Sequence, residues 1–168
     1  MDGVEAFDAM PTAEVERRLL ACCAAPGWAA TVAAGRPYRT RASIIAAADA
    51  AARGLSWAEV EQALAAHPRI GERAAGNSRE AAWSRSEQSA AAGGGQPAVT
   101  ALADANRAYE QRFGHIFLIF ANGRSADEIL AAAAERAGND PATERAVVAG
   151  ELRKIALLRL ERLLDVLG

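Results

Sequence analysis

Apolar residues recur along this chain at the spacing of one face of an α-helix. The clearest stripe, with steps of three and four positions, consists of Val99, Leu102, Asn106, Tyr109 and Phe113. A second stripe, near the end of the chain, consists of Val148, Leu152, Ile155, Arg159, Leu163 and Val166. Each stripe predicts a long helix with one buried face, and each is interrupted by one polar residue.

Start and stop signals predict further helices. Ser56 and Ser125 each stand three positions before a glutamate, which is the capping-box pattern of a helix start. Glycine and proline predict the breaks, among them Pro26-Gly27 and the three glycines at 93–95, where we expect a flexible turn. The predicted helices cover residues 11 to about 24, 41–53, 56 to before 67, 79 to about 92, 97–113, 125–138 and 141 to about 167.

Between the helices, the run from Ile116 to Ala121 is uniformly apolar. It is either a short buried strand or a core helix, and periodicity does not decide between them. Alanine, leucine, arginine and glutamate dominate the composition, which favours helix. We therefore predict a single compact all-α domain over residues 1–168.

Composition and charge exclude several classes of protein. Of the 168 residues, 51% are hydrophobic and 24% charged, as is typical of a globular chain. Nineteen basic side chains against 21 acidic ones argue against nucleic-acid binding. No apolar run approaches the ~20 residues of a membrane span, and the first residues lack the features of a signal peptide. Cys22 and Cys23 are adjacent and are not expected to form a disulfide, so we expect a reducing compartment.

The sequence also limits the chemistry. The two histidines and two cysteines match no zinc-ligand spacing, so we expect no metal site. Motifs for dinucleotide binding, phosphate loops and the hydrolase nucleophile are missing. Catalysis, if there is any, is expected to use side chains alone.

His67 is the first candidate for such chemistry. Imidazole exchanges protons near neutral pH, with an ordinary pKa of about 6.5. Pro68 should keep His67 at a helix end, because the residue before a proline avoids the α conformation. The alternative is a surface or capping histidine, and His115, after the helix-ending Gly114, is interpreted in that way.

Three further regions carry candidate groups. Ser84, Glu87 and Gln88 would share one helix face, suited to a small polar heterocycle; the alternative is a solvated surface. Arg159 lies in an apolar stripe and is either paired inside the protein or binds an anionic ligand, whereas Asn106 is interpreted as a buried amide that fixes helix packing. Backbone N–H groups could hold a carbonyl or carboxylate at a turn formed by Ile119, Phe120, Ala121, Asn122 and Gly123.

Taken together, these regions resemble one enzyme family. The motifs, in order, are His67-Pro68-Arg69-Ile70-Gly71, Ser84-x-x-Glu87-Gln88, Asn106-x-x-Tyr109-x-x-Arg112-Phe113-Gly114 and Gly123-Arg124-Ser125-Ala126-Asp127-Glu128. They resemble the 2-oxo-4-hydroxy-4-carboxy-5-ureidoimidazoline (OHCU) decarboxylases of urate breakdown. The resemblance extends over nearly the whole chain through Leu20–Cys23 with Trp28, Arg36-Pro37-Tyr38 and Glu151-x-x-Lys154-Ile155-x-x-x-Arg159-Leu160.

The resemblance implies an all-helical, usually dimeric enzyme without a cofactor, which removes CO2 from the ureidoimidazoline and yields (S)-allantoin. It maps the catalytic acid to His67 and the motif glutamate to Glu87. It maps substrate contacts to Pro68, Ser84, Arg85, Ser86, Glu87, Gln88, Ile119, Phe120, Ala121, Asn122, Gly123 and Arg159. At Phe120 the sequence departs from the pattern, because related sequences often carry a smaller residue such as cysteine there.

The cellular setting and the alternatives complete the prediction. The alanine- and arginine-rich composition, with a chain end unlike a Ser-Lys-Leu signal, predicts a bacterial protein in the cytoplasm. The competing functions are a non-catalytic helical interaction or ureide-binding module, and a hydrolase acting on a related ureide. No nucleophile or metal constellation in the sequence favours the hydrolase.

Overall fold

The structure is a computed structural model that describes residues 1–72, 76 and 78–168. Throughout these ranges the regular secondary structure is helical, which confirms the predicted all-α class. The α-helices, with one 3-10 helix η1 (Ala91–Gly94), are α1 (Gly3–Ala9), α2 (Thr12–Cys22), α3 (Pro26–Ala34), α4 (Arg41–Arg53), α5 (Trp57–Leu64), α6 (Arg79–Glu87), α7 (Gly95–Phe113), α8 (Ala126–Arg136) and α9 (Pro141–Leu167).

The chain divides into two compact units. The first consists of Met1–Ala63 and Leu152–Gly168, and the second of Leu64–Glu151. Helix α9 contributes its beginning to the second unit and its remainder to the first. The prediction of one domain over residues 1–168 stays a prediction, and the units are described separately below.

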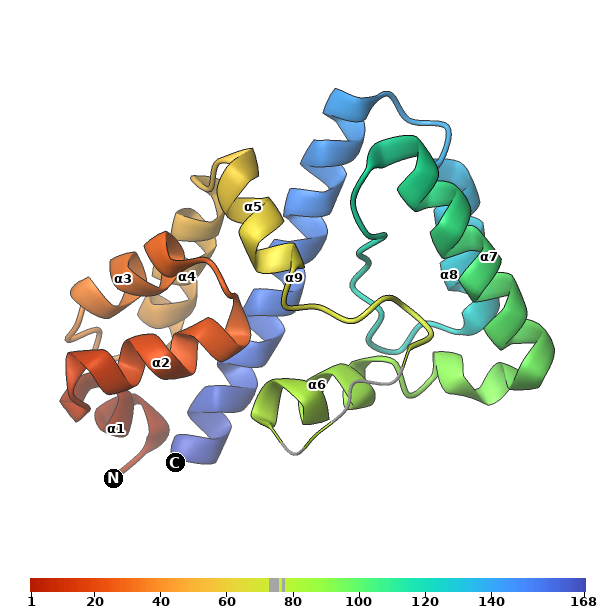
Figure 1. The fold of residues 1–168 in the computed structure, drawn as a ribbon. Helices are drawn as coiled ribbons and strands as arrows, with labels where there is room; N and C mark the ends of the chain where they lie inside the picture. Colours follow the sequence, from red (N-terminus) through yellow and green to blue (C-terminus); the bar gives the residue numbers. More distant parts are fainter. Residues whose placement is uncertain (73–75, 77) are drawn as a thin grey trace. The chain divides into compact units, whose positions relative to one another are not determined.

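In the first unit, α2 packs against α3, and α3 against α4 (Figure 1). Trp28 of α3 is buried, and its indole N–H donates a hydrogen bond to the Ala48 carbonyl of α4 at 3.0 Å. The guanidinium of Arg36 donates to the carbonyls of Phe7 and Met10, at 2.9 and 2.6 Å, and so fixes the chain after α3 against the end of α1. Trp28 and Arg36, two of the residues on which the family resemblance rests, therefore stabilise the fold of the first unit.

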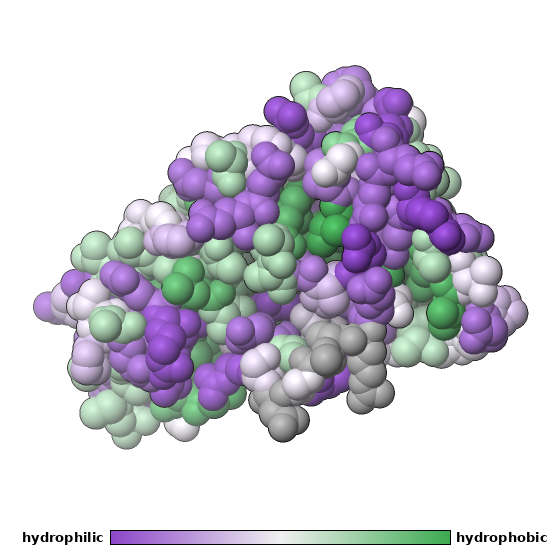
Figure 2. Space-filling model, viewed as in Figure 1, coloured by the Kyte–Doolittle hydropathy of each residue, from purple (hydrophilic) through white to green (hydrophobic). Residues whose placement is uncertain are grey.

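In the second unit, α7 packs against α8 and η1 (Figure 1). The core cluster of this unit contains Ile70, Ala91, Leu102, Tyr109, Phe117, Ile119, Ala121, Ala126, Ile129 and Ala133. Hydrophilic residues cover much of the visible surface (Figure 2). Val99 and Val166, the ends of the two predicted stripes, are exposed, because each lies beyond the buried part of its helix.

Several helix predictions are confirmed. α4 and α9 have the predicted bounds, because both are delimited by local signals: Thr40 caps α4, and Pro141 opens α9. Ser125 and Glu128 form the predicted capping box, with two hydrogen bonds of 3.2 Å. Ser56 accepts from the N–H of Glu59 at the start of α5, also at 3.2 Å.

Other predictions are wrong. Pro26-Gly27 does not break the chain but begins α3, since proline suits the first helical turn and Trp28 and Val32 are buried behind it. The sequence also left α1 unrecognised. α6 ends at Glu87 rather than near Ala92, and the glycines at 93–95 belong to η1 and the start of α7 instead of a turn. The chain leaves α6 after Glu87 and forms η1, in which Ala91 is buried in the core of the second unit.

Candidate active site

His67 lies in a short non-helical segment that follows α5. Its backbone N–H donates to the Leu64 carbonyl at 3.0 Å, which places it directly after the helix end, as predicted. His67 and Pro68 are half-buried. The segment ends at Gly71, whose φ of +88° lies in the left-handed region that favours glycine. Residues 67–71 are called the His67 segment below.

Side chains from α6 and α7 hold the His67 segment. The amide nitrogen of Asn106 donates to the Ile70 carbonyl at 2.7 Å, and the amide oxygen of Gln88 accepts the Gly71 N–H at 2.9 Å. Arg69 forms an exposed ion pair with Glu110, at 2.6 Å. Asn106 thus fixes the packing of a loop on α7, which refines the predicted role of a buried amide in helix packing.

Helix α6 carries the next group of candidates. Its N-cap Ser78 accepts from the N–H of Ala81 at 3.2 Å. Ser84 and Glu87, one turn apart, are both buried, with 5% and 6% exposure. A hydroxyl and a carboxylate therefore lie together on the inner face of α6. On the same helix Arg85 is half-buried and donates to the Gly76 carbonyl at 3.1 Å, while Ser86 is exposed.

The third candidate region follows α7 and is neither strand nor helix, so both predicted alternatives for residues 116–121 are wrong. Ile119 and Ala121 are buried and Phe120 is half-buried, whereas Asn122 and Gly123 are exposed. Gly123 has a φ of +78°. Arg124 closes the turn with two hydrogen bonds, from its backbone N–H to the Ala121 carbonyl at 2.9 Å and from its Nε to the Phe120 carbonyl at 3.0 Å. Residues 115–124 are called the Ile119 segment below.

A buried charged network supports the Ile119 segment. Arg136 donates to Glu144 at 2.8 and 2.5 Å and to the Leu118 carbonyl at 2.6 Å, while Tyr109 donates to Glu144 at 2.5 Å. The Arg136 guanidinium also lies over the Phe117 ring, 4.5 Å from its centroid. The network is not predictable from the sequence, because nothing in the spacing of Tyr109, Arg136 and Glu144 marks them as partners.

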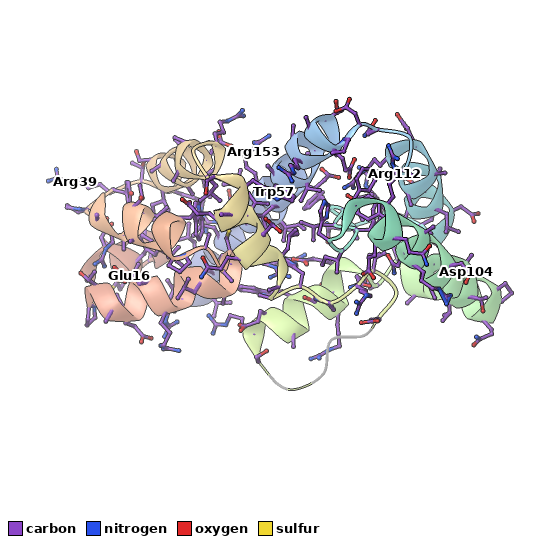
Figure 3. The ribbon with its side chains drawn as sticks, turned by 45° about the horizontal axis from the view of Figure 1, so that its top comes forward. Glu16, Arg39, Trp57, Asp104, Arg112 and Arg153 are labelled. Atoms are coloured by element: carbon purple, nitrogen blue, oxygen red, sulfur yellow. The ribbon has the colours of Figure 1, made fainter. Side chains whose placement is uncertain are left out.

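The network determines the charge of its members. Burial alone would raise the pKa of Glu144, but hydrogen bonds from Arg136, Tyr109 and Asn139 outweigh it and hold that pKa below its ordinary value. Burial, followed by the hydrogen bond to Glu144, raises the pKa of Tyr109. Glu144 is therefore a carboxylate and Tyr109 a neutral donor at neutral pH. Near this network Arg112, labelled in Figure 3 at the carboxyl end of α7, donates to the Asn139 carbonyl at 2.6 Å.

Arg159 belongs to the first unit, on the part of α9 after residue 151. It is buried, as the apolar stripe predicted, with 4% exposure, and its Nη1 donates to the Ala21 carbonyl at 3.3 Å. Burial raises the pKa of the Cys23 thiol to about 11, and the charge of Arg159 opposes that shift. Cys22 and Cys23 are both buried, and no disulfide joins them.

Two cavities border the His67 segment in the second unit. One, of about 360 Å³, has Gly71, Arg85, Gln88 and Leu102 among its lining residues. The other, of about 380 Å³, is lined in part by Ile70 and Asn106. The first cavity brings Arg85 and Gln88 together beside the His67 segment. Neither His67 nor Glu87 is among the described residues that line either cavity.

Over residues 1–72, 76 and 78–168, no group of three or more His, Cys, Asp or Glu side chains is arranged to hold a metal ion. None of the helices in the described part of the chain combines the length and apolar character that a bilayer span requires.

Comparison with known proteins assigns the chain to a family. The sequence profile of the OHCU decarboxylases matches residues 8–161, which is most of the chain. The chain belongs to the OHCU decarboxylase family. The resemblance of the ordered motifs is thereby confirmed, and the decarboxylases of this family are carboxy-lyases.

Individual relatives are also similar to this chain in sequence. The 2-oxo-4-hydroxy-4-carboxy-5-ureidoimidazoline decarboxylase of Amia calva is 34% identical over 148 residues, which cover 83% of this chain and 81% of that protein. The uric acid degradation bifunctional protein TTL of Arabidopsis thaliana is 35% identical over 145 residues, or 84% of this chain. The match covers 45% of the Arabidopsis protein, so this chain corresponds to less than half of its length.

Solved structures confirm the OHCU decarboxylase fold. A crystal structure of OHCU decarboxylase in the presence of (S)-allantoin has a TM-score of 0.75 and 32% identity, covering 87% of this chain and 96% of that one. An (S)-allantoin synthase structure has a TM-score of 0.70 over 97% of this chain and 54% of that one, at 19% identity, and supports the fold alone.

Proposed function

We propose that this chain decarboxylates 2-oxo-4-hydroxy-4-carboxy-5-ureidoimidazoline to (S)-allantoin in urate degradation. The observation that carries the proposal is the family match over residues 8–161. The relative whose crystal structure was determined in the presence of (S)-allantoin, at 32% identity, supports (S)-allantoin as the product.

The reaction sets clear demands on the protein. The bond between the carboxylate and the ring carbon that also bears the hydroxyl breaks, CO2 leaves, and the electron pair moves into the adjacent ring C=N bond to give an enol-like anion. A proton must then reach the neighbouring ring carbon, which bears the ureido group, from one side, while the hydroxyl loses its proton and becomes a carbonyl of allantoin. The protein therefore has to orient the substrate, stabilise the developing anion and deliver the proton.

His67 is the proposed proton donor. It transfers its proton to the ring carbon that bears the ureido group, and the imidazole regains a proton from solvent. Delivery from one side gives the S configuration. Its place directly after α5, with Pro68 next to it and the following peptide held by α6 and α7, supports this role, because an acid that sets stereochemistry must have a fixed position.

Glu87 is proposed to anchor the substrate hydroxyl or ureido N–H groups and to favour the imidazolium form of His67. Its position supports this role, because the buried carboxylate lies beside Ser84 on the inner face of α6. The remaining proposed contacts to the substrate come from Pro68, Ser84, Arg85, Ser86, Gln88, Ile119, Phe120, Ala121, Asn122, Gly123 and Arg159.

Arg159 is proposed to bind an anionic or carbonyl edge of the substrate. Its hydrogen bond to the Ala21 carbonyl equally fits a structural role within the first unit. The proposal further includes catalysis without a cofactor, a homodimeric assembly and a place in the bacterial cytoplasm.

The test is a coupled reaction of urate, urate oxidase, hydroxyisourate hydrolase and this protein, followed by circular dichroism of the product. We expect faster appearance of one allantoin enantiomer. The same slow racemate as without the protein would indicate a non-catalytic module, and a product other than allantoin would indicate a ureide hydrolase.

Substitution of His67 tests its role. His67→Ala should abolish enantioselective formation of allantoin and slow turnover by ~10²–10⁴-fold, the usual contribution of general acid catalysis. His115→Ala, at the chain's only other histidine, is the matched control and should keep selectivity. Normal optical activity of the product from His67→Ala would remove His67 from the mechanism.

Two further variants separate binding from structure. Glu87→Gln should strongly reduce turnover with the fold retained, while Glu80→Gln, on the exposed first turn of the same helix, should not. For Arg159→Leu, weaker substrate binding without a lower melting temperature supports ligand binding, and the reverse supports a structural arginine.

A further inference from the structure

The hydrogen bonds from α6 and α7 to the His67 segment converge on one peptide group. The Ile70 carbonyl and the Gly71 N–H belong to the same peptide unit. Asn106 of α7 donates to the carbonyl, at 2.7 Å, and Gln88 at the end of α6 accepts from the N–H, at 2.9 Å. Both polar groups of this peptide are thus bound by side-chain amides from different helices.

The chemistry of this arrangement fixes the orientation of both amides. Within a side-chain amide only the NH2 group donates, so the Nδ2 group of Asn106 must face the Ile70 carbonyl. Only the amide oxygen accepts, so the Oε1 atom of Gln88 must face the Gly71 N–H. Each amide therefore has one orientation, and the peptide plane between them has one as well.

Asn106 is a polar residue at a buried position where the pattern of α7 favours an apolar side chain. It is 5% exposed, within the α7 stripe that includes Leu102 and Tyr109. A buried amide is unfavourable unless it forms hydrogen bonds, and Asn106 donates to the backbone carbonyl of Ile70, three residues beyond His67.

The groups next to the Ile70–Gly71 peptide restrict its conformation. Gly71 has a φ of +88°, and a Cβ at that position would lie 3.3 Å from the Cβ of Leu102. The Ile70 side chain is buried in the same core cluster as Leu102. On the other side, Pro68 restricts the backbone next to His67.

We propose that Asn106 and Gln88 form a two-helix clamp on the Ile70–Gly71 peptide, and that Asn106 is a positioning residue for His67. This inference rests on the proposed function, in which His67 must approach one side of the ring carbon that bears the ureido group. Asn106 does not act on the substrate itself; it determines where the imidazole is held.

The test compares a variant at Asn106 with a control variant in the same core. Asn106→Leu removes the donor and keeps the volume, while Ile129→Val, in a fully buried position of the same core, removes one methylene. Asn106→Leu should lower kcat by ~10–100-fold, as expected for a small misplacement of a catalytic group, with KM changed less than about twofold. The enantiomeric excess of allantoin should fall with kcat, and Ile129→Val should preserve both.

Spectroscopy provides a readout independent of activity. Hydrogen exchange at the Gly71 amide should accelerate in Asn106→Leu, and the NMR signals of His67 should shift. The chain has only two histidines, so His115→Ala assigns these signals. Should Asn106→Leu not fold, Asn106→Asp replaces it. Its activity relative to wild type should rise as pH falls, because only a protonated carboxyl can donate to the Ile70 carbonyl.

The clamp would be overturned if Asn106→Leu changed neither kcat nor the hydrogen-exchange rate of the Gly71 amide. It would also be overturned if Asn106→Asp, used in its place, recovered no activity relative to wild type at low pH. If Ile129→Val lost as much kcat as Asn106→Leu, the loss in Asn106→Leu would be explained by lower stability, and the positioning role of Asn106 would be overturned. If wild type forms no allantoin, the proposed function fails instead, and the exchange and His67 signals still decide whether Asn106 positions His67.

Discussion

The second unit contains two non-helical segments that carry candidate site residues, and they are held in different ways. The His67 segment is held by neutral amides on one peptide group and by the exposed Arg69–Glu110 ion pair. The Ile119 segment is held by ionised groups, because the Leu118 carbonyl is bound by Arg136, which is paired with the fully buried Glu144.

The difference has energetic consequences. A neutral hydrogen bond contributes ~0.5–1.5 kcal/mol net to stability, whereas loss of one partner of a buried ion pair costs about 3–5 kcal/mol. We infer that the Ile119 segment is part of the folding core, since its support cannot be lost without destabilising the unit. The His67 segment can be displaced with less effect on stability, which makes its position separately testable.

The largest expected effect is at Glu144. Glu144→Gln leaves the buried Arg136 without its carboxylate and should lower the free energy of unfolding by about 3–5 kcal/mol. Urea denaturation measures this loss. An effect below about 1 kcal/mol would contradict the inference that the ion pair is part of the folding core.

The pH dependence of the same variant sharpens the comparison. The pKa of Glu144 is depressed in the folded state, so its stabilisation is complete above the unfolded pKa, near 4.5, and is lost as pH falls through the folded value. The difference in unfolding free energy between wild type and Glu144→Gln should therefore be constant near neutral pH and shrink below about pH 4.5. Ile129→Val, which changes no titrating group, should show a difference that does not depend on pH.

A pair of glycine substitutions compares the segments directly. Gly71 and Gly123 have φ values of +88° and +78°, but a Cβ at Gly71 would meet Leu102 at 3.3 Å, whereas one at Gly123 would have nothing within 4 Å. Each substitution to alanine should cost about 1–2 kcal/mol of conformational strain. Gly71→Ala should cost more because Leu102 must also move, and equal melting temperatures would show that the contact adds nothing.

The smallest effect is expected at the exposed ion pair. Glu110→Gln removes the charge opposite Arg69, whose side chain is 49% exposed. Solvent and salt screen such pairs, so the melting temperature should change little, and less still at high salt. A loss of kcat in Glu110→Gln as large as the loss expected for Asn106→Leu would show that the ion pair, and not the peptide clamp, holds the His67 segment.

The success of the sequence predictions depended on the range of the interactions involved. α4, α9 and the capping box at Ser125 were predicted because caps act within one helical turn. The motif order was sufficient to indicate the family, since the residues of each motif lie close together in the chain. α3 was missed because its formation depends on burying Trp28, and the end of α6 because it depends on burying Ala91.

The sequence by itself determined the helical class, the family and the candidate residues His67 and Glu87, because composition, capping and short motifs are properties of neighbouring positions. Only the tertiary structure revealed that Asn106 and Gln88 meet at one peptide, and that Arg136 and Glu144 support the Leu118 carbonyl. Asn106 and Ile70 are 36 positions apart and Tyr109 and Glu144 are 35 apart, so only folding brings each pair together. Burial then makes each of these polar groups dependent on its partner.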